Sequence, residues 1–155
     1  AWLGLGRRNQ FEGQTPLAVE AAATTALRGP APELPLPVHE LPAGSAATCE
    51  LDWRPLLETM LVERARGTTA AVLAGAFHRA LAAGIVAMAR RAGAGAIVLT
   101  GGCFQNALLL DLAAEMLRDA HFEVLIHREL PPNDGNIAAG QALGALWNLT
   151  SVALP

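Results

Sequence analysis

The sequence contains no lysine, so its eleven basic residues are all arginine. This absence excludes a catalytic lysine that forms a Schiff base and the lysine of a phosphate-binding P-loop. Cysteine is also scarce, because Cys49 and Cys103 are the only two and they form no C-x-x-C pair. Two cysteines so far apart exclude a disulfide scaffold and a zinc ribbon.

Charge is low as well. Charged residues make up 16% of the 155 residues and the net charge is −3, which argues against a non-specific nucleic-acid binder. The apolar share of 52% excludes wholesale disorder and suffices for one compact core. The most apolar stretch, 68–93, is interrupted by a histidine and three arginines, which favours a helix of a soluble protein over a membrane span. With no signal-peptide pattern, we expect a cytoplasmic protein.

The first half of the chain reads as helices around a proline-rich segment. Thr15 followed by Pro16 predicts the cap and first residue of a helix. The segment 30–47 is interpreted either as a linker or as part of a hairpin with edge strands near 36–41 and 48–52.

Helices and strands then alternate. Asp52 is predicted to cap a helix that ends at Gly67, and Thr68 and Thr69 start a long helix that ends at Gly93. Large apolar residues recur along this long helix every three or four positions and predict its buried face: Leu73, Phe77, Leu81, Ile85 and Met88.

From residue 96 the order is strand, helix, strand, helix. The apolar run 96–100 predicts a strand buried on both faces, and 122–126 predicts a second strand. A last helix is predicted to end near Trp147. This alternation is typical of an α/β architecture.

A glycine-rich turn follows the first of these strands. Without Cβ atoms, Gly101 and Gly102 would let a ligand lie directly against the backbone, and the free N–H groups of a helix N-terminus favour an anion. Asn106, predicted to lie about one turn into that helix, has an amide that suits a sugar hydroxyl or a phosphate. The same glycines also fit a tight turn that needs them only for its geometry, so spacing leaves both interpretations open.

The second loop that could carry chemistry is 131–136. Asp134 fits the N-cap of the last helix, and a carboxylate at the mouth of a sheet also suits a divalent cation. One carboxylate is not a metal site, so further ligands would have to come from elsewhere. Among the remaining candidates, His78 is interpreted as a core or interhelical histidine, His127 as a surface residue and Cys103 as a packing residue.

Several ordered segments resemble the C-terminal end of the HypF family of hydrogenase-maturation carbamoyltransferases. They cover residues from about 11 to 147 and are FEGQTPLAVEAAA, LDWRPLL, GAFHRAL, IVLTGGCFQNALLLDL and LPPNDGNIAAGQAL. In that family this region is the C-terminal lobe of a domain with the actin/hexokinase-type two-lobed fold. The resemblance therefore implies a single α/β lobe over 1–155, with a small mixed sheet flanked by helices.

The resemblance also implies site residues. Gly101, Gly102 and Asn106 match the nucleotide-binding motif of the family, and Asp134 matches the aspartate that binds a metal in relatives. In those relatives a histidine pair of the other lobe completes the metal site, and this chain lacks that pair. The implied cofactors are ATP or carbamoyl-adenylate and a divalent metal.

The implied reaction is carbamoyl transfer. HypF proteins make carbamoyl-adenylate from carbamoyl phosphate and ATP and pass the carbamoyl group to the C-terminal cysteine of HypE, on the way to the cyanide ligands of nickel-iron hydrogenase. The implied partners are thus a HypE-like acceptor and the missing N-terminal lobe or a parent HypF-like chain, with no nucleic acid and no membrane. This chain would form only half of the active-site cleft, so we do not expect it to catalyse the reaction alone.

The sequence departs from the family pattern at three positions: Cys103 replaces a usual valine, Ala107 an arginine and Asn136 a glycine. These changes keep an alternative open, in which the chain is a degenerate stand-alone homologue that acts as a non-catalytic binding or scaffolding subunit. An apolar face left exposed by the missing lobe would favour a homodimer.

Overall fold

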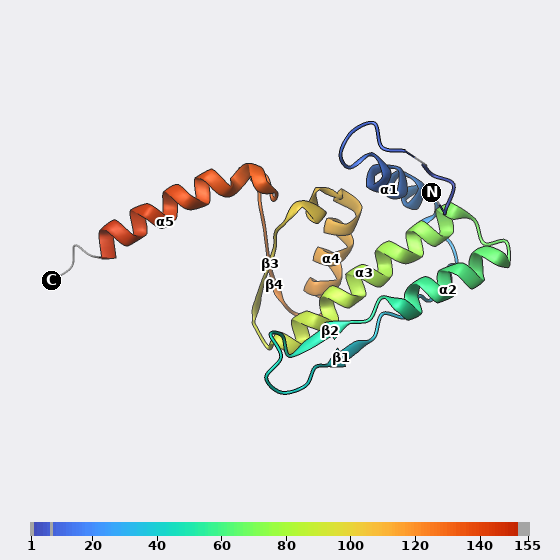
Figure 1. Ribbon diagram of the computed structural model, residues 1–155, viewed down its shortest axis with the longest axis horizontal. Helices are drawn as coiled ribbons and strands as arrows, with labels where there is room; N and C mark the ends of the chain where they lie inside the picture. The colour runs from blue at the N-terminus through green and yellow to red at the C-terminus, as the bar shows by residue number, and fades with distance from the viewer. Residues whose placement is uncertain (1, 7, 152–155) are drawn as a thin grey trace.

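The computed structural model describes residues 2–6 and 8–151, which form helices and two small pairs of strands (Figure 1). The helices are α1 (Gln14–Ala26), α2 (Arg54–Ala65), α3 (Ala70–Ala92), α4 (Ala107–Asp119) and α5 (Ile137–Ser151). The strands are β1 (Val38–Glu40), β2 (Cys49–Leu51), β3 (Ala96–Leu99) and β4 (Glu123–Ile126). Two 3₁₀ turns, η1 (Gly102–Gln105) and η2 (Asp134–Asn136), precede α4 and α5.

The strands form two separate sheets. β1 pairs with β2 in an antiparallel hairpin, and β3 pairs with β4 in parallel, with Ala96 opposite Glu123 and Leu99 opposite Ile126. The α4 helix connects β3 to β4, as parallel pairing requires. The expected α/β class, with small sheets flanked by helices, is confirmed.

The central element is α3, which contacts α1, α2, α4 and β1. It begins and ends as the sequence predicts: the side chain of Thr69 accepts a hydrogen bond from the backbone N–H of Val72, and Gly93 ends the helix in the left-handed conformation. By length and composition α3 could cross a membrane, but half of its most apolar window is buried inside the protein. It is the core helix of the protein.

The buried face of α3 differs from the prediction. Of the five large apolar residues expected there, Leu73 is buried and the other four are only partly buried. Most of the buried positions of α3 are small residues, because several elements pack closely around this one helix: Ala74, Gly75, Ala76, Ala80, Ala82, Gly84 and Ala89. At Gly75 an added Cβ would lie 3.6 Å from the backbone oxygen of Ala23 in α1. Small residues allow this approach.

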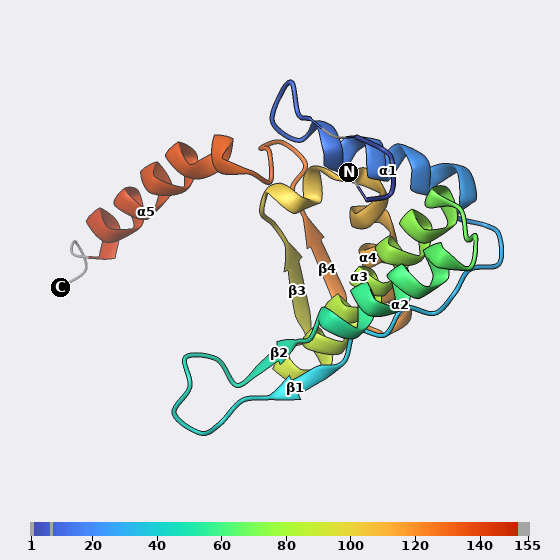
Figure 2. The same ribbon diagram turned by 45° about the vertical axis from the view of Figure 1, so that its right-hand side comes forward.

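Among the described residues, helices cover the parallel sheet on one face only (Figure 2). On the covered face Leu99 packs in one cluster with Val86 of α3 and Leu117 of α4. On the other face Val98 is 56% exposed and Leu125 46%. The prediction that strand 96–100 is buried on both faces is therefore wrong for this structure, because α3 and α4 lie on the same side of the sheet.

The N-caps of two helices also differ from those predicted from the sequence. The N-cap of α1 is Gly13, and Thr15 lies inside the helix, where its hydroxyl bonds to Asn9. The N-cap of α2 is Trp53. Asp52 nevertheless holds the start of α2, because its carboxylate accepts hydrogen bonds from the backbone N–H of Arg54 at 3.0 Å and from the guanidinium Nε at 2.7 Å.

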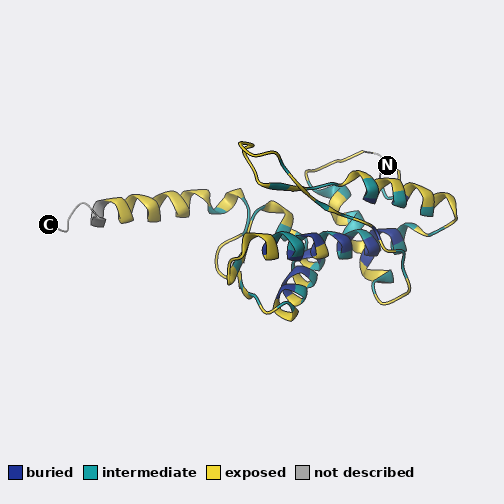
Figure 3. Ribbon diagram, turned by 90° about the horizontal axis from the view of Figure 1, so that it is seen from below, coloured by how far each residue is buried: buried dark blue, intermediate teal, exposed yellow. Residues whose placement is uncertain are grey.

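The last helix, α5, extends away from the rest of the protein (Figures 1 and 3). It continues past Trp147, where the sequence predicted its end, to Ser151. Large apolar residues on α5 are at least half exposed: Ile137, Leu143, Leu146 and Trp147. The apolar residues of α5 and the open face of the sheet thus add to the exposed apolar surface of the lobe.

Candidate nucleotide and metal site

The two loops singled out in the sequence meet at the carboxyl ends of β3 and β4. The backbone N–H of Gly101 donates to the carbonyl oxygen of Pro132 at 2.7 Å. Beside it, Nε2 of His127 lies 2.9 Å from the hydroxyl oxygen of Thr100. This edge of a parallel sheet is where ligands of open α/β folds bind. His127, predicted to be a surface residue, is partly buried and contacts Thr100 at this edge.

The first loop needs glycine at one position. Gly101 has φ 100° and ψ 158°, a conformation that other residues rarely adopt. After it, η1 intervenes before α4 begins, so Asn106 is the N-cap of α4 and does not lie one turn inside the helix. Its side-chain Oδ1 accepts from the backbone N–H of Leu109 at 2.8 Å.

The free N–H groups lie on the η1 turn. At the start of α4, the N–H of Leu109 is bound by Asn106, and the N–H of Leu108 donates to Oε1 of Glu20 at 3.1 Å. Over the described part of the chain, the backbone N–H groups of Gly102 and Cys103 show no hydrogen-bond partner. An anion would therefore find its donors on η1, directly after Gly101.

Asn106 also contacts α3. Its Nδ2 lies 2.9 Å from Nε2 of His78, and Nδ1 of that ring lies 2.8 Å from the carbonyl oxygen of Ala74. His78 is only 2% exposed. The interpretation of His78 as an interhelical histidine is confirmed.

In the second loop, Asn133 and not Asp134 is the cap. The Oδ1 atom of Asn133 accepts from the backbone N–H of Gly135 at 3.0 Å. The carboxylate of Asp134 is exposed and accepts no hydrogen bond from the described residues. The N-cap interpretation of Asp134 is therefore wrong, and its carboxylate is available for another partner. Nearby, the side-chain oxygen of Asn136 is buried and has no hydrogen-bond partner among the residues that the structure describes.

The donor set does not complete a metal site. Within the described residues, no group of three or more His, Cys, Asp and Glu side chains lies close enough together to hold a metal ion. Asp134 can supply a single carboxylate ligand, and a divalent cation needs several more. The chain alone therefore does not fit a bound metal.

Sequence reasoning missed Glu20, which caps α4 from α1, 88 residues away along the chain. A carboxylate at a helix N-terminus is favourable because it meets the positive end of the helix dipole. One sequence feature did point to this residue: Glu20 is the last residue of the segment FEGQTPLAVE, which matches the family pattern. That match marked the segment without saying what the glutamate contacts.

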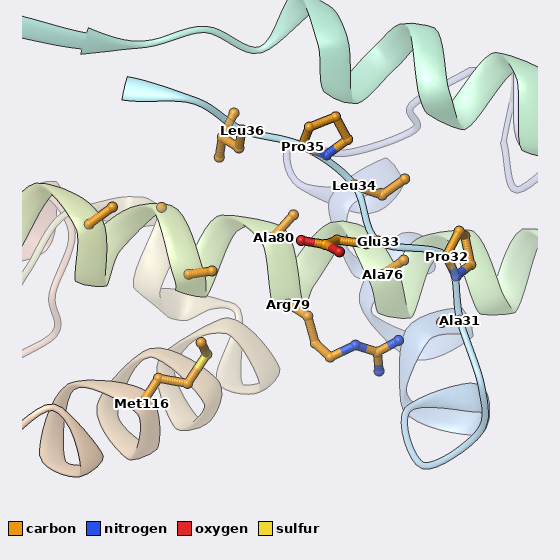
Figure 4. A pocket seen from close by; sticks show the side chains of 13 residues that line it. Ala31, Pro32, Glu33, Leu34, Pro35, Leu36, Ala76, Arg79, Ala80 and Met116 are labelled. Carbon is orange, nitrogen blue, oxygen red and sulfur yellow. The ribbon is translucent and has the colours of Figure 1, made fainter. Parts of the chain in front are cut away.

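A groove of about 530 Å³ lies elsewhere, between α3 and the proline-rich segment 31–36 (Figure 4). Ala76 and Ala80 of α3 form part of its wall, and Met116 of α4 lies at its edge. Arg79, also in the wall, donates from Nη1 to the carbonyl oxygen of Leu27 at 2.7 Å. None of the predicted site residues lines this groove, so it is distinct from the candidate site.

Comparison with known proteins identifies the family. Residues 1–141 match the family described as the carbamoyltransferase Kae1-like domain, second subdomain, of HypF. The chain belongs to this family. Curated relatives include the carbamoyltransferase HypF of Synechocystis and that of Rhodobacter capsulatus, each 36% identical over 93% of this chain. The chain spans 18% of the length of either relative.

Solved structures agree with the family and with the fold of the second subdomain. The crystal structure of full-length HypF in a phosphate- and nucleotide-bound form superposes on 92% of this chain with a TM-score of 0.75 and 26% identity. The crystal structure of T. kodakarensis HypF covers 95% of it with a TM-score of 0.71 and shares its fold. This chain spans 18% of each of these longer proteins.

Proposed function

We propose that the chain is the nucleotide-binding half of a HypF-like carbamoyltransferase. The observation that carries the proposal is the pair of free N–H groups on Gly102 and Cys103 at the carboxyl edge of the parallel sheet. Two adjacent backbone donors at such an edge suit the phosphate of a nucleotide. The related full-length HypF was crystallised in a phosphate- and nucleotide-bound form, which supports this ligand class.

The reaction would be the transfer of a carbamoyl group from carbamoyl-adenylate to a cysteine of a HypE-like acceptor protein. The acceptor sulfur would form a bond to the carbamoyl carbon, and the bond from that carbon to the oxygen of the adenylate phosphate would break to release AMP. The role of this lobe would be to hold the adenylate: the N–H groups of Gly102 and Cys103 would bind phosphate oxygens, and the second amide hydrogen of Asn106 Nδ2 is available for a further polar contact. In a complete protein whose other lobe adds the remaining ligands, Asp134 would supply one ligand to a divalent metal, and the chemistry that metal would supply is polarisation of the carbamoyl carbonyl.

The reaction would need the rest of a larger cytoplasmic protein or a partner chain. The chain spans 18% of the HypF relatives, and the described residues supply one carboxylate at the proposed metal position. The N-terminal lobe of a parent chain would then supply the opposite wall of the cleft and the remaining metal ligands.

The decisive experiment is a calorimetric titration of the chain with ATP and Mg²⁺, beside a Gly102→Asp variant. We expect saturable binding that the variant loses, because a carboxylate on η1 would repel the phosphates. A chain that binds no ATP, or a variant that binds as well as the unaltered chain, would contradict a nucleotide site on η1.

A second candidate function is a non-catalytic binding or scaffolding subunit. The observation in its favour is the exposed apolar surface of β3, β4 and α5, which is typical of a protein interface or of a homodimer. This function predicts that the chain captures a HypE-like acceptor or a HypF N-terminal lobe equally well when Gly102 is replaced by Asp. Loss of capture in that variant would contradict it.

A further inference from the structure

His78 is a polar side chain in the middle of the α3 core, where it is 2% exposed. Burial of a polar group without hydrogen-bond partners is unfavourable, so its partners matter. Both ring nitrogens have one: Nδ1 faces the carbonyl oxygen of Ala74 at 2.8 Å, and Nε2 faces Nδ2 of Asn106 at 2.9 Å. The second contact joins the segments GAFHRAL and GGCFQN.

The direction of each hydrogen bond follows from the partners. A carbonyl oxygen only accepts, so Nδ1 of His78 carries the hydrogen and donates to Ala74. In this neutral ring Nε2 is an acceptor, and the amide of Asn106 donates to it. The Oδ1 atom of the same amide accepts from the N–H of Leu109, which agrees with this orientation. The three bonds form one continuous chain from α4 to α3.

This chain of bonds ends at the candidate site. Asn106 follows η1 directly, and its backbone N–H donates to the carbonyl oxygen of Cys103 at 3.2 Å. The residue held by His78 is thus bonded to the turn that presents the free N–H groups of Gly102 and Cys103. Without the imidazole, Nδ2 of Asn106 would lose its acceptor inside a partly buried contact, and the amide could turn.

We propose that His78 is a positioning residue for the nucleotide site, because its imidazole holds the Asn106 amide in one orientation and, through it, the η1 turn. The inference rests on the proposed function, since it assigns His78 to the same site. Because His78 is buried, it acts through Asn106 and does not touch the ligand. A histidine that only filled the core would leave the turn unchanged when an apolar side chain of similar size replaced it.

The test compares three variants of the chain. His78→Leu keeps an apolar volume and removes the acceptor, whereas His78→Gln keeps a side-chain oxygen that can accept from Asn106. Leu56→Val is the control, because Leu56 is a residue of α2 that is buried in the other core cluster. Circular dichroism and urea unfolding establish that each variant folds and how much stability it loses.

Two measurements follow. Nitrogen-15 NMR spectra report the side-chain amide of Asn106 and the backbone N–H groups of Gly102 and Cys103, and calorimetry reports the affinity for ATP with Mg²⁺. We expect His78→Leu to shift all three signals and to weaken ATP binding by about 5-fold, the equivalent of one lost hydrogen bond. His78→Gln should recover most of both effects, and Leu56→Val should show neither.

Each contrary result has a definite meaning. Unchanged signals in His78→Leu, a loss of affinity no greater than that of Leu56→Val, or equal effects of His78→Gln and His78→Leu would overturn the positioning role. If the unaltered chain binds no ATP, that result contradicts the proposed function but does not test the role of His78. The NMR signals then decide by themselves whether His78 holds the turn, so the two failures are distinguishable.

Discussion

Gly101 donates its backbone N–H to the carbonyl oxygen of Pro132 at 2.7 Å, and this bond joins the two loops that the sequence marked as candidates for chemistry. It places the free N–H groups of η1 and the carboxylate of Asp134 on loops that are fixed to each other. The loops arise after β3 and β4, whose parallel pairing brings their carboxyl ends to one edge. The candidate site therefore depends on the conformation of Gly101.

Gly101→Ala should destabilise the chain, whereas Gly102→Ala should not. An alanine at position 101 would have to adopt φ 100°, which costs about 1–3 kcal/mol. At Gly102 an added Cβ would meet the Cβ of Asn133 at 4.0 Å, an ordinary contact, so the change should stay within about 0.5 kcal/mol. Urea unfolding followed by circular dichroism measures both. Equal effects of the two substitutions would show that the turn does not require the conformation of Gly101.

Asp134→Ala should abolish carbamoyl transfer in a complete protein that carries this lobe, without unfolding it. The carboxylate is exposed and accepts no hydrogen bond from the described residues, so its loss should change stability by no more than about 0.5 kcal/mol. The loss of a metal ligand should reduce the rate of transfer to the acceptor more than about 100-fold. Asp111→Ala, at an exposed position of α4, is the matched control and should transfer normally. Full activity of the Asp134 variant would remove the metal role.

Substitutions at two neighbouring positions of β3 should differ sharply in their effect. Leu99 is 3% exposed in the core cluster, so Leu99→Ala should lower the free energy of unfolding by about 2–5 kcal/mol. Val98 is 56% exposed, so Val98→Thr should change it by no more than about 0.5 kcal/mol. Thermal or urea unfolding of the chain checks both values. A large loss from Val98→Thr would mean that the second face of the sheet is covered in solution, for example by another copy of the chain.

Stability should fall in acid partly because of Asp52. Hydrogen bonds from the side chain and the backbone N–H of Arg54, with the charge of its guanidinium, hold the pKa of the Asp52 carboxyl below its usual value. A group whose pKa is lowered by folding stabilises the protein above the usual carboxyl range, and that contribution disappears as the pH falls through the lowered pKa.

The measurement is the urea midpoint between pH 2 and pH 6 for the unaltered chain and for Asp52→Asn. We expect the variant to be less stable near neutral pH and to lose less stability on acidification. Glu58→Gln, at an exposed position of α2, serves as the control for a change of net charge. A variant with the same acid profile as the unaltered chain would show that Asp52 does not contribute to the pH dependence.

Local features were predictable from the sequence because they depend on residues a few positions apart. The ends of α3 follow from the cap at Thr69 and the left-handed Gly93, and both lie where the sequence placed them. The glycine turn after β3 and the order strand, helix, strand were also predictable, since glycine suits φ 100° and since apolar runs mark the two strands on either side of the helix. The ordered segments that resemble HypF gave the family, which the comparisons confirm.

Tertiary structure alone decided how those pieces meet. The pairing of His78 with Asn106 and the cap that Glu20 places on α4 join residues 28 and 88 positions apart, and no local pattern encodes such distances. The same holds for β3: its apolar residues predicted burial on both faces, but α3 and α4 pack on one side and leave Val98 exposed. Hydrophobicity records that a side chain can be buried, whereas the arrangement of the neighbouring elements determines whether it is.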